Sequence, residues 1–475
     1  MLAAAVRASL VAVALAASLL GAQRALAQGV ASDLDTGPGG VPAGMRALWS
    51  SAPVVDVDPL EPDSRSAGLQ EALARCPGAG GCILQLRADT TYTLPPHATW
   101  SSALGGVEPV TAFQTNGADD VWLRGHGDGS VIAYTQAGNG PDRLLRNFML
   151  TANNGSDRIL FSDFRVERVD QCTIDCQEYA MVFTALGNVS DVVIDRVSVR
   201  STQLAHDGSY PGRNVFMVFA IAYPVVTAAN TPRRMRVQNS RFSMSSSGIH
   251  TNHCDDCSFV GNRFDAAGVP DYENGATVRA FTTFKGRKYL IARNAIDLAL
   301  DGRTALNWTA CLNLSGDQTW DPNQPASARV NEGAAVIGNL CTGLRQYSAA
   351  GLYFEGYRDA NVTGNHIYAG LCSNDLLRSC RTRDDCPGAP AASCNPAPAK
   401  AFYFADKQWP NANSNQGNVL RSNRLGDGTN CAVRIDTASD ADPNGNTGNL
   451  FVATRIGSPR ARKLASAAAA RPSVR

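Results

Sequence analysis

A short pattern recurs along the chain and constrains the fold more than any other feature. Each copy has apolar residues two positions apart, then an asparagine, then another apolar residue two positions on. The clearest copies are residues 257–264, 289–296, 334–341, 360–367 and 418–425, and weaker ones begin at Ile159, Val192, Met235 and Asn449. Apolar residues two apart point to the same side of a β-strand. The pattern therefore predicts short strands that end at asparagine-containing bends.

The repeated asparagines and their spacing together favour a coil. An asparagine at a bend can bond its own backbone and tolerate a left-handed conformation, and stacked copies would form a ladder in which each amide bonds the next. Copies start 22 to 58 residues apart, so the shortest fits one bare turn of three short strands and the longer ones add corner loops. An antiparallel sandwich also alternates apolar and polar residues, but stacking repeats favour an all-β, single-stranded parallel β-helix.

A second series of strands supports the same architecture. Its expected inward residues are Ile249, Val278, Leu306, Leu352, Phe402 and Val433. The residues that follow them should point outward, and these are His250, Arg279, Asn307, Tyr353, Tyr403 and Arg434. Two positions further along the strands lie Asn252, Phe281 and Glu355. Because neighbouring rungs stack about 4.8 Å apart, we expect these side chains to line one face of the coil.

The start of the chain's body resembles a known superfamily. Residues 68–76 have helical spacing of apolar residues, with Ser66 as a cap, and a Gly-rich turn and the strand Ile83–Leu86 follow. Residues 121–132 look like a first coil. This order resembles the pectate-lyase-like superfamily over residues 69–451. The resemblance implies a right-handed parallel β-helix with a short N-terminal helix, and it implies that basic residues serve catalysis where the protein is a lyase.

The chain divides into five predicted segments. Residues 1–27 read as a secretory signal peptide, since Arg7 precedes the apolar run Leu10–Leu20 and Ala25-Leu26-Ala27 offers a cleavage site; an N-terminal membrane anchor is the alternative. The others are an N-terminal extension at 28–65, the β-helix at 66–456, a Cys-rich loop inserted at 372–394 and a basic, disordered tail at 457–475. The signal predicts a secreted protein, extracellular or periplasmic.

Thirteen cysteines point to disulfides in an exported chain, with at least one cysteine left over. Cys254 and Cys257 form a single Cys-x-x-Cys element, and a zinc site normally needs two such pairs or added histidines. We therefore assign disulfides and no metal to the cysteines. Asp255, Asp256 and Asp271 could bind calcium through oxygen ligands, although corner aspartates more often cap turns.

Charge excludes some partners. The formal net charge is +1, and the tail from Arg455 onward holds six basic and no acidic residues, so the body of the chain is negative. Such a body does not suggest nucleic acid as a partner, and no later stretch is long enough to cross a membrane. Aromatic, amide and charged side chains along one face suit a polysaccharide, bound by a monomer.

The outward face predicts the chemistry of a lyase. In β-elimination a base removes the proton next to a uronic carboxyl while a cation neutralises that carboxyl. His250 and Arg279 would supply these two functions, in either assignment, with Glu355 as a third catalytic residue and Tyr353 as an acid. The predicted substrate-binding residues are Asn252, Phe281, Asn307, Tyr353, Tyr403 and Arg434.

Two other readings stay open. An inverting hydrolase needs two carboxylates about 6.5–9.5 Å apart, and only Glu355 and Asp436 qualify on this face. A non-catalytic extracellular module that binds glycan or acts as a spacer would also display stacked polar residues. Gly125-His126-Gly127 is interpreted as a turn rather than a catalytic element.

Earlier rungs look too apolar for an open site. There the same outward column is predicted to hold Val182, Thr184, Phe216 and Val218. We expect a loop near Ala220–Asn230, or another segment, to cover them, so that the site begins near His250.

Overall fold

The computed structural model resolves a coil of short strands. It describes residues 45, 49–60, 64–78, 81–95, 101–102, 110–134, 147–169, 179–200, 214–223, 227, 229–244, 247–266, 276–284, 286–298, 306–315, 331–344, 349–368, 370–380, 384, 386–388, 394–396, 400–404, 417–425, 433–435, 450–452 and 455–456. Two compact units divide the chain at Ser51. Of the first unit only Met45 and residues 49–51 are described, and Met45 and Trp49 are buried. The predicted signal peptide and basic tail lie outside the described residues.

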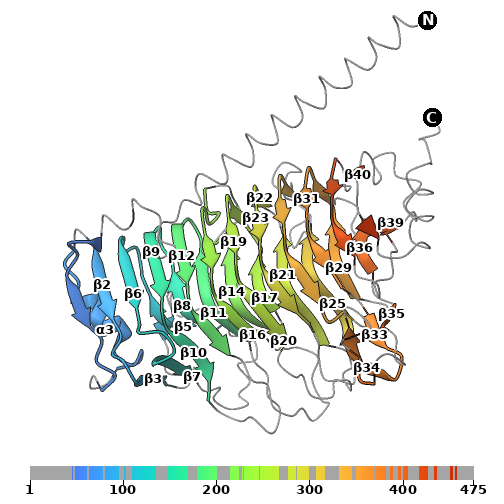
Figure 1. Cartoon of the computed structure of the whole chain (residues 1–475). Helices are drawn as coiled ribbons and strands as arrows, with labels where there is room; N and C mark the ends of the chain where they lie inside the picture. Colours follow the sequence, from blue (N-terminus) through green and yellow to red (C-terminus); the bar gives the residue numbers. More distant parts are fainter. Residues whose placement is uncertain are drawn as a thin grey trace, which may run out of the picture. The chain divides into compact units, whose positions relative to one another are not determined.

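The second unit contains three long sheets whose strands are stacked in sequence order (Figure 1). Each turn of the coil gives one strand to each sheet, and every neighbouring pair in the three sheets is parallel except β4 with β5. The first sheet begins at β1, within the residues predicted as an extension. This topology confirms the predicted all-β parallel β-helix.

The strands of the first sheet are β1 (Val54–Asp56), β2 (Cys82–Gln85), β6 (Val121–Arg124), β9 (Asp157–Ser162), β12 (Ser190–Asp195), β15 (Arg236–Gln238), β19 (Ser258–Val260), β23 (Leu290–Ala292), β27 (Ala335–Ile337), β31 (Asn361–Thr363), β37 (Val419–Arg421) and β40 (Leu450–Val452). Those of the second sheet are β3 (Thr90–Leu94), β7 (Ser130–Tyr134), β10 (Arg165–Arg168), β13 (Ser198–Arg200), β16 (Arg241–Met244), β20 (Arg263–Ala266), β24 (Ala295–Asp297), β28 (Leu340–Thr342), β32 (His366–Ile367), β38 (Arg424–Leu425) and β41 (Arg455–Ile456).

The third sheet has the longest strands. They are β4 (Ser101–Ser102), β5 (Val110–Gln114), β8 (Asn147–Ala152), β11 (Tyr179–Leu186), β14 (Asn214–Ile221), β17 (Ser247–Thr251), β21 (Ala276–Phe284), β25 (Leu306–Ser315), β29 (Ala349–Glu355), β36 (Lys400–Phe404) and β39 (Val433–Ile435). A short corner sheet contains β18 (Cys254–Asp255), β22 (Gly286–Arg287), β26 (Asn331–Glu332) and β30 (Tyr357–Arg358).

The core fills the inside of the coil, and the third-sheet strands depart from the usual alternation of inward and outward residues. In each strand from β17 to β36 a small buried residue directly precedes a large apolar residue of the core. Examples are Ala280 with Phe281 and Cys311 with Leu312. The first of the two residues is small because it faces the second sheet. A Cβ on Gly248 of β17 would lie 2.6 Å from Cε1 of Phe264 on β20. Strict alternation of inward and outward residues therefore fails here.

The asparagine ladder is confirmed. Asn262, Asn294, Asn339, Asn365 and Asn423 are buried, and each amide Nδ2 donates to Oδ1 of the next at 2.8–3.1 Å. Each Oδ1 beyond the first also accepts the backbone N–H of the preceding asparagine, as in Asn262 to Asn294 at 2.9 Å. The left-handed conformation was assigned to the wrong residue. It belongs to the residue before each asparagine, for example Gly261 (φ 69°) and Arg293 (φ 55°), which leaves the asparagine in an ordinary conformation with its amide inward.

The helix and the Cys-rich insert lie at the predicted places. Helix α3 (Leu69–Ala74) is shorter than expected, and Ser66 Oγ accepts the N–H of Gln70 at 2.8 Å near its start. The insert forms a separate sheet of β33 (Gly370–Cys372), β34 (Asp375–Cys380) and β35 (Cys394–Pro396). Disulfides join Cys372 to Cys386 and Cys380 to Cys394. No helix in the described ranges is long and apolar enough to cross a membrane.

Candidate functional site

The candidate site lies on the outward face of the third sheet. The strands β8 to β36 lie side by side there, so their outward residues form columns across the sheet (Figure 1). One column of outward residues runs from β8 to β36, and we call it the outer column. Its members are Thr151, Thr184, Phe219, His250, Thr282, Asn313, Tyr353 and Tyr403. The predicted alignment of His250 with Tyr353 and Tyr403 is confirmed, and Arg434 pairs with Tyr403 on the next strand.

Three of the predicted site residues occupy other positions than expected. Register pairs Arg279 with Ser247 and Phe281 with Ile249, so Arg279 lies in a column beside the outer column. The prediction that Phe281 faces outward is wrong, since it is a core residue that packs against Phe259 and Phe264. Asn313 rather than Asn307 pairs with Tyr353, so the placement predicted for Asn307 is also wrong. The two successive inward residues Ala280 and Phe281 explain the error at Phe281, whereas the β25 residue that pairs with Tyr353 lies six positions beyond Asn307.

His250 stands where the outer column changes from apolar to polar. Its ring stacks on Phe219 with centroids 5.4 Å apart, and Nε2 is 2.8 Å from Oδ1 of Asn252. Burial lowers the pKa of His250 to about 3, with a smaller lowering from the charge of Arg279, while the hydrogen bond to Asn252 opposes both. His250 is therefore neutral at physiological pH. With Asn252 Oδ1 as acceptor, the proton is on Nε2 and the basic lone pair is on Nδ1.

Arg279 is the cation of the site. Burial lowers its pKa to about 10, and attraction to Tyr353 and Glu355 opposes this lowering. Arg279 therefore keeps its charge at neutral pH and interacts with groups on both sides of it along the sheet. Residues Ala310 and Ala350, which follow it in its own column, are small, and this gives its long side chain room above β25 and β29.

Tyr353 and Glu355 form the second half of the site. Glu355 is 4% exposed and accepts hydrogen bonds from Ser315 Oγ at 3.0 Å and from the Tyr353 hydroxyl at 3.5 Å. Burial raises the pKa of Tyr353 far above its ordinary value, and repulsion from Glu355 adds to this, so Tyr353 stays protonated. The rings of Tyr353 and Tyr403 meet edge to face at 5.1 Å. Sequence reasoning missed Ser315 and Asn313, which lie in a strand whose register it misplaced.

The rungs before His250 present an apolar outer face, although not with the predicted residues. Val182 and Val218 belong to the inner core, so the prediction that they point outward is wrong. The outward residues are Phe148, Met181, Leu186 and Phe219, which we call the apolar outer cluster. All four are at most 3% exposed, but Thr282 (0%) and Asn313 (1%) of the outer column are buried to the same degree, so burial alone does not separate this stretch from the candidate site. The side chain of Phe216 lies outside the described residues.

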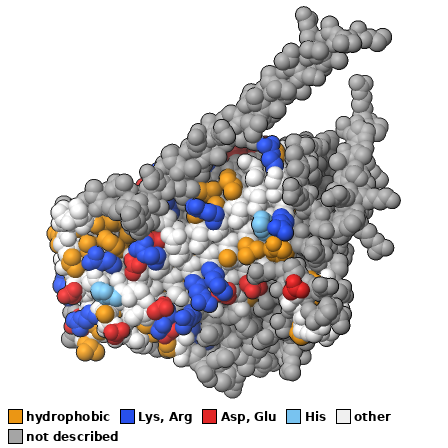
Figure 2. Space-filling model, viewed as in Figure 1, with side chains coloured by type: hydrophobic (Ala, Val, Ile, Leu, Met, Phe, Trp, Pro, Cys, Tyr) orange, Lys and Arg blue, Asp and Glu red, His pale blue; other side chains and the backbone are white. Residues whose placement is uncertain are grey.

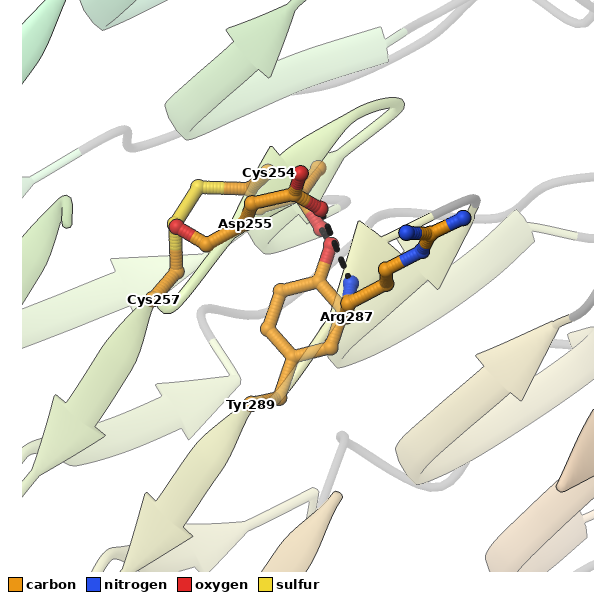
Figure 3. Close-up of a disulfide and its surroundings, with 6 residues drawn as sticks. Cys254, Asp255, Cys257, Arg287 and Tyr289 are labelled. Carbon is orange, nitrogen blue, oxygen red and sulfur yellow. Dashed lines mark hydrogen bonds between the residues drawn. A yellow bond between two sulfur atoms is a disulfide. The ribbon is translucent and has the colours of Figure 1, made fainter. Parts of the chain in front are cut away.

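The corner that follows β17 is fixed by a disulfide. Cys254 and Cys257 are joined to each other, which confirms disulfide chemistry for these two cysteines, and both are buried (Figure 3). Asp255 Oδ1 accepts the backbone N–H of Arg287 at 3.1 Å, and the hydroxyls of Tyr289 and Thr251 are 2.9 Å apart. Asp256 lies 3.7 Å from Lys288. The two carboxylates therefore serve the turn and an ion pair, Asp271 lies outside the described residues, and calcium binding stays a prediction.

Other parts of the surface carry mixed charge. On the face shown in Figure 2, basic and acidic side chains are interspersed. On the second sheet, for example, Asp265 pairs with both Arg241 and Arg263. Acidic side chains there would repel a polyanion while the basic ones attract it. In the described third-sheet strands, the acidic residue near Arg279 is Glu355.

Comparisons with known proteins identify no specific family. No protein-family model matches the chain, and no curated relative matches its sequence. Among solved structures, the A-module of an Azotobacter vinelandii mannuronan C-5 epimerase is 14% identical, covering 83% of this chain and 92% of its own, with a TM-score of 0.40. An iota-carrageenase bound to iota-carrageenan fragments is 10% identical (86% and 89% covered, TM-score 0.39).

An endo-xylogalacturonan hydrolase from Aspergillus tubingensis is 12% identical, with 86% and 94% covered and a TM-score of 0.31. Likeness at these values says nothing about reaction or substrate. The structure itself establishes the architecture, which is three long sheets of stacked strands wound from one chain, with a short helix in the first turn. The chain thus has a parallel β-helix fold.

Proposed function

We propose that the protein is an exported enzyme that cleaves a uronate-containing polysaccharide by β-elimination at the outer face of the third sheet. The observation that supports this proposal is that a charged, largely buried Arg279 on β21 lies near enough to a neutral His250 on the adjacent strand β17 for its charge to lower the pKa of that histidine. A uronic carboxylate bound at Arg279 would join Glu355 as an anionic neighbour of this cation, and its binding would add negative charge beside His250.

The two residues would divide the reaction between them. Arg279 binds the carboxylate and neutralises it, which acidifies the proton on the adjacent carbon. His250 takes that proton, the electron pair of the broken C–H bond forms the new C=C bond, and the glycosidic oxygen leaves with the C–O pair. The imidazolium then returns the proton to the leaving oxygen. The carboxylate raises the pKa of His250 toward its ordinary value, so the bound substrate makes His250 a stronger base.

Tyr353 is assigned to binding rather than to proton transfer. It lies three strands from His250, which is about 14 Å at the spacing of neighbouring strands. One glycosidic bond cannot bring both groups into the same step. Tyr353, Tyr403 and Asn252 would instead bind neighbouring sugars, as aromatic rings and amides do.

Product formation tests the proposal. We would incubate the purified mature protein, with and without calcium, on uronate and neutral polysaccharides, and follow both ultraviolet absorbance of unsaturated ends and new reducing ends. We expect absorbance that falls at least about 100-fold in Arg279→Ala and in His250→Ala. Arg241→Ala, which changes an exposed arginine on the second sheet, is the matched control and should retain full activity.

The other outcomes discriminate the remaining readings. Reducing ends without absorbance would indicate hydrolysis and direct attention to Glu355, with Asp436, outside the described residues, as its partner. Loss of activity in the Arg241 control to the same extent as in Arg279→Ala would disprove the assignment of the site. Neither signal on any polysaccharide would favour a non-catalytic glycan-binding module.

A further inference from the structure

Two polar residues of the outer column lie between His250 and Tyr353, and no function has yet been given to them. Thr282 on β21 pairs with His250, and Asn313 on β25 pairs with both Thr282 and Tyr353. Thr282 is fully buried and Asn313 is 1% exposed. Thr282 Oγ1 and Asn313 Oδ1 make no hydrogen bond within the part of the chain that the structure describes.

Among the buried asparagines that the structure describes, Asn313 is the one whose amide oxygen makes no hydrogen bond. Buried polar atoms in proteins nearly always have a hydrogen-bond partner, and the ladder asparagines obey this rule, since Asn294 Oδ1 accepts both the N–H and the Nδ2 of Asn262. Asparagine is also a poor strand residue. Asn313 is flanked by Leu312 and Leu314 of the core, so its side chain points away from the core to the outer face, where Tyr353 is its neighbour.

Threonine alone would not carry this argument. Thr151 and Thr184 occupy the outer column beside the apolar outer cluster, and their hydroxyls also have no partner in the described ranges. A threonine suits a strand through its branched Cβ whether or not its hydroxyl is bonded. The inference therefore rests on Asn313, and Thr282 joins it by position.

We infer that Asn313, with Thr282, binds the hydroxyl groups of a sugar next to the uronate held by Arg279. This inference rests on the proposed function and deepens it. Asn313 Oδ1 accepts a hydroxyl hydrogen and thereby gains the bond that the protein does not supply. The site is consequently specific for a sugar with a free hydroxyl at that position. An O-acetylated or O-methylated sugar would leave the oxygen unbonded, and sites of this kind discriminate strongly against such analogues.

Three variants separate this role from a structural one. In Asn313→Leu we expect KM for the polysaccharide to rise at least tenfold, while the thermal denaturation midpoint stays the same or rises, because a buried unbonded group has been removed. Thr282→Val should show a smaller rise in KM. Thr184→Val is the matched control, with the same change in the same column outside the site, and should leave KM unchanged. O-acetylation of the substrate should reduce kcat/KM for the wild type and much less for Asn313→Leu.

Each other result counts against the inference. An unchanged KM in Asn313→Leu with a lower denaturation midpoint would mean that an ordered water, not a sugar, bonds the amide. If Arg279→Ala is inactive while Asn313→Leu has the wild-type KM, the proposed function stands and this inference fails. If the wild type cleaves no polysaccharide, its affinity for the same uronate polymers is measured by calorimetric titration. Equal affinity of the wild type and Asn313→Leu, or no binding by either protein, would overturn the inference.

Discussion

The two halves of the third sheet have the same backbone and opposite chemistry on their outer face. Before β17 the outer residues are Phe148, Met181, Leu186 and Phe219, which pack together. From β17 onward the outer column holds His250, Thr282, Asn313, Tyr353 and Tyr403. Inward residues are equally apolar in both halves. The coil is therefore specified by its interior, which leaves the outer face available for a second purpose.

The bends between the first two sheets change at nearly the same place. From Asn262 onward the bend residue is an asparagine whose amide bonds its neighbour on the next rung. In the earlier rungs the equivalent residues are Phe164, Val197 and Ser240, and exposed arginines such as Arg196 pair with Asp163 outside them. The polar half of the outer face, from β17 to β36, thus belongs to the same rungs that the asparagine ladder joins. The ladder holds the strands of these rungs in register.

Breaking the ladder should have the largest effect on stability. Asn294→Ala removes Oδ1, which accepts two hydrogen bonds from Asn262, and leaves Phe259 O without the Nδ2 donor. Buried groups that lose partners cost about 1–3 kcal/mol each, so we expect about 4 kcal/mol. Val197→Ala at the equivalent bend should cost about 2 kcal/mol, for two buried methyl groups. Denaturant titration of both variants checks this, and a larger loss in Val197→Ala would contradict a special role of the ladder.

The pH dependence of stability should reflect His250. Its folded pKa, about 3, lies below its unfolded value near 6.5. Between these values the unfolded chain binds a proton and the folded chain does not, so this residue makes stability fall as pH drops from about 6.5 to about 3. The slope is about 1.4 kcal/mol per pH unit. In His250→Gln the denaturation midpoint should vary less over this window, and an unchanged slope would mean that His250 titrates normally.

Exposed ion pairs at the bends of the earlier rungs should contribute least to the stability of the fold. Arg234 pairs with Asp191, and the Arg234 side chain is 47% exposed. Such pairs contribute about 0–1 kcal/mol, so Arg234→Met should shift the denaturation midpoint only slightly at low salt and less at high salt. A loss as large as that of Asn294→Ala would show that the charged bends and the asparagine ladder stabilise the coil alike.

The sequence was sufficient to predict the coil, because its asparagine bends recur visibly and each has a physical reason to stack. It was also sufficient for His250, Tyr353 and Tyr403, whose strands begin with recognisable apolar residues. It was insufficient for Phe281 and Asn313. Strict alternation assumes one inward residue in two, whereas β21 places two successive residues in the core, and the β25 residue that pairs with Tyr353 lies six positions beyond Asn307. The departure on β21 depends on packing against the opposite sheet, which no local pattern records.

A crystal structure of the His250→Asn variant with a bound uronate oligosaccharide would test the assignment of the polar half most directly. We predict sugar density across β17 to β36, with a carboxylate at Arg279, a hydroxyl at Asn313 and a ring against Tyr353. Sugar bound over the second sheet at Arg241 and Arg263, or over the apolar outer cluster, would contradict the division of the face that we describe.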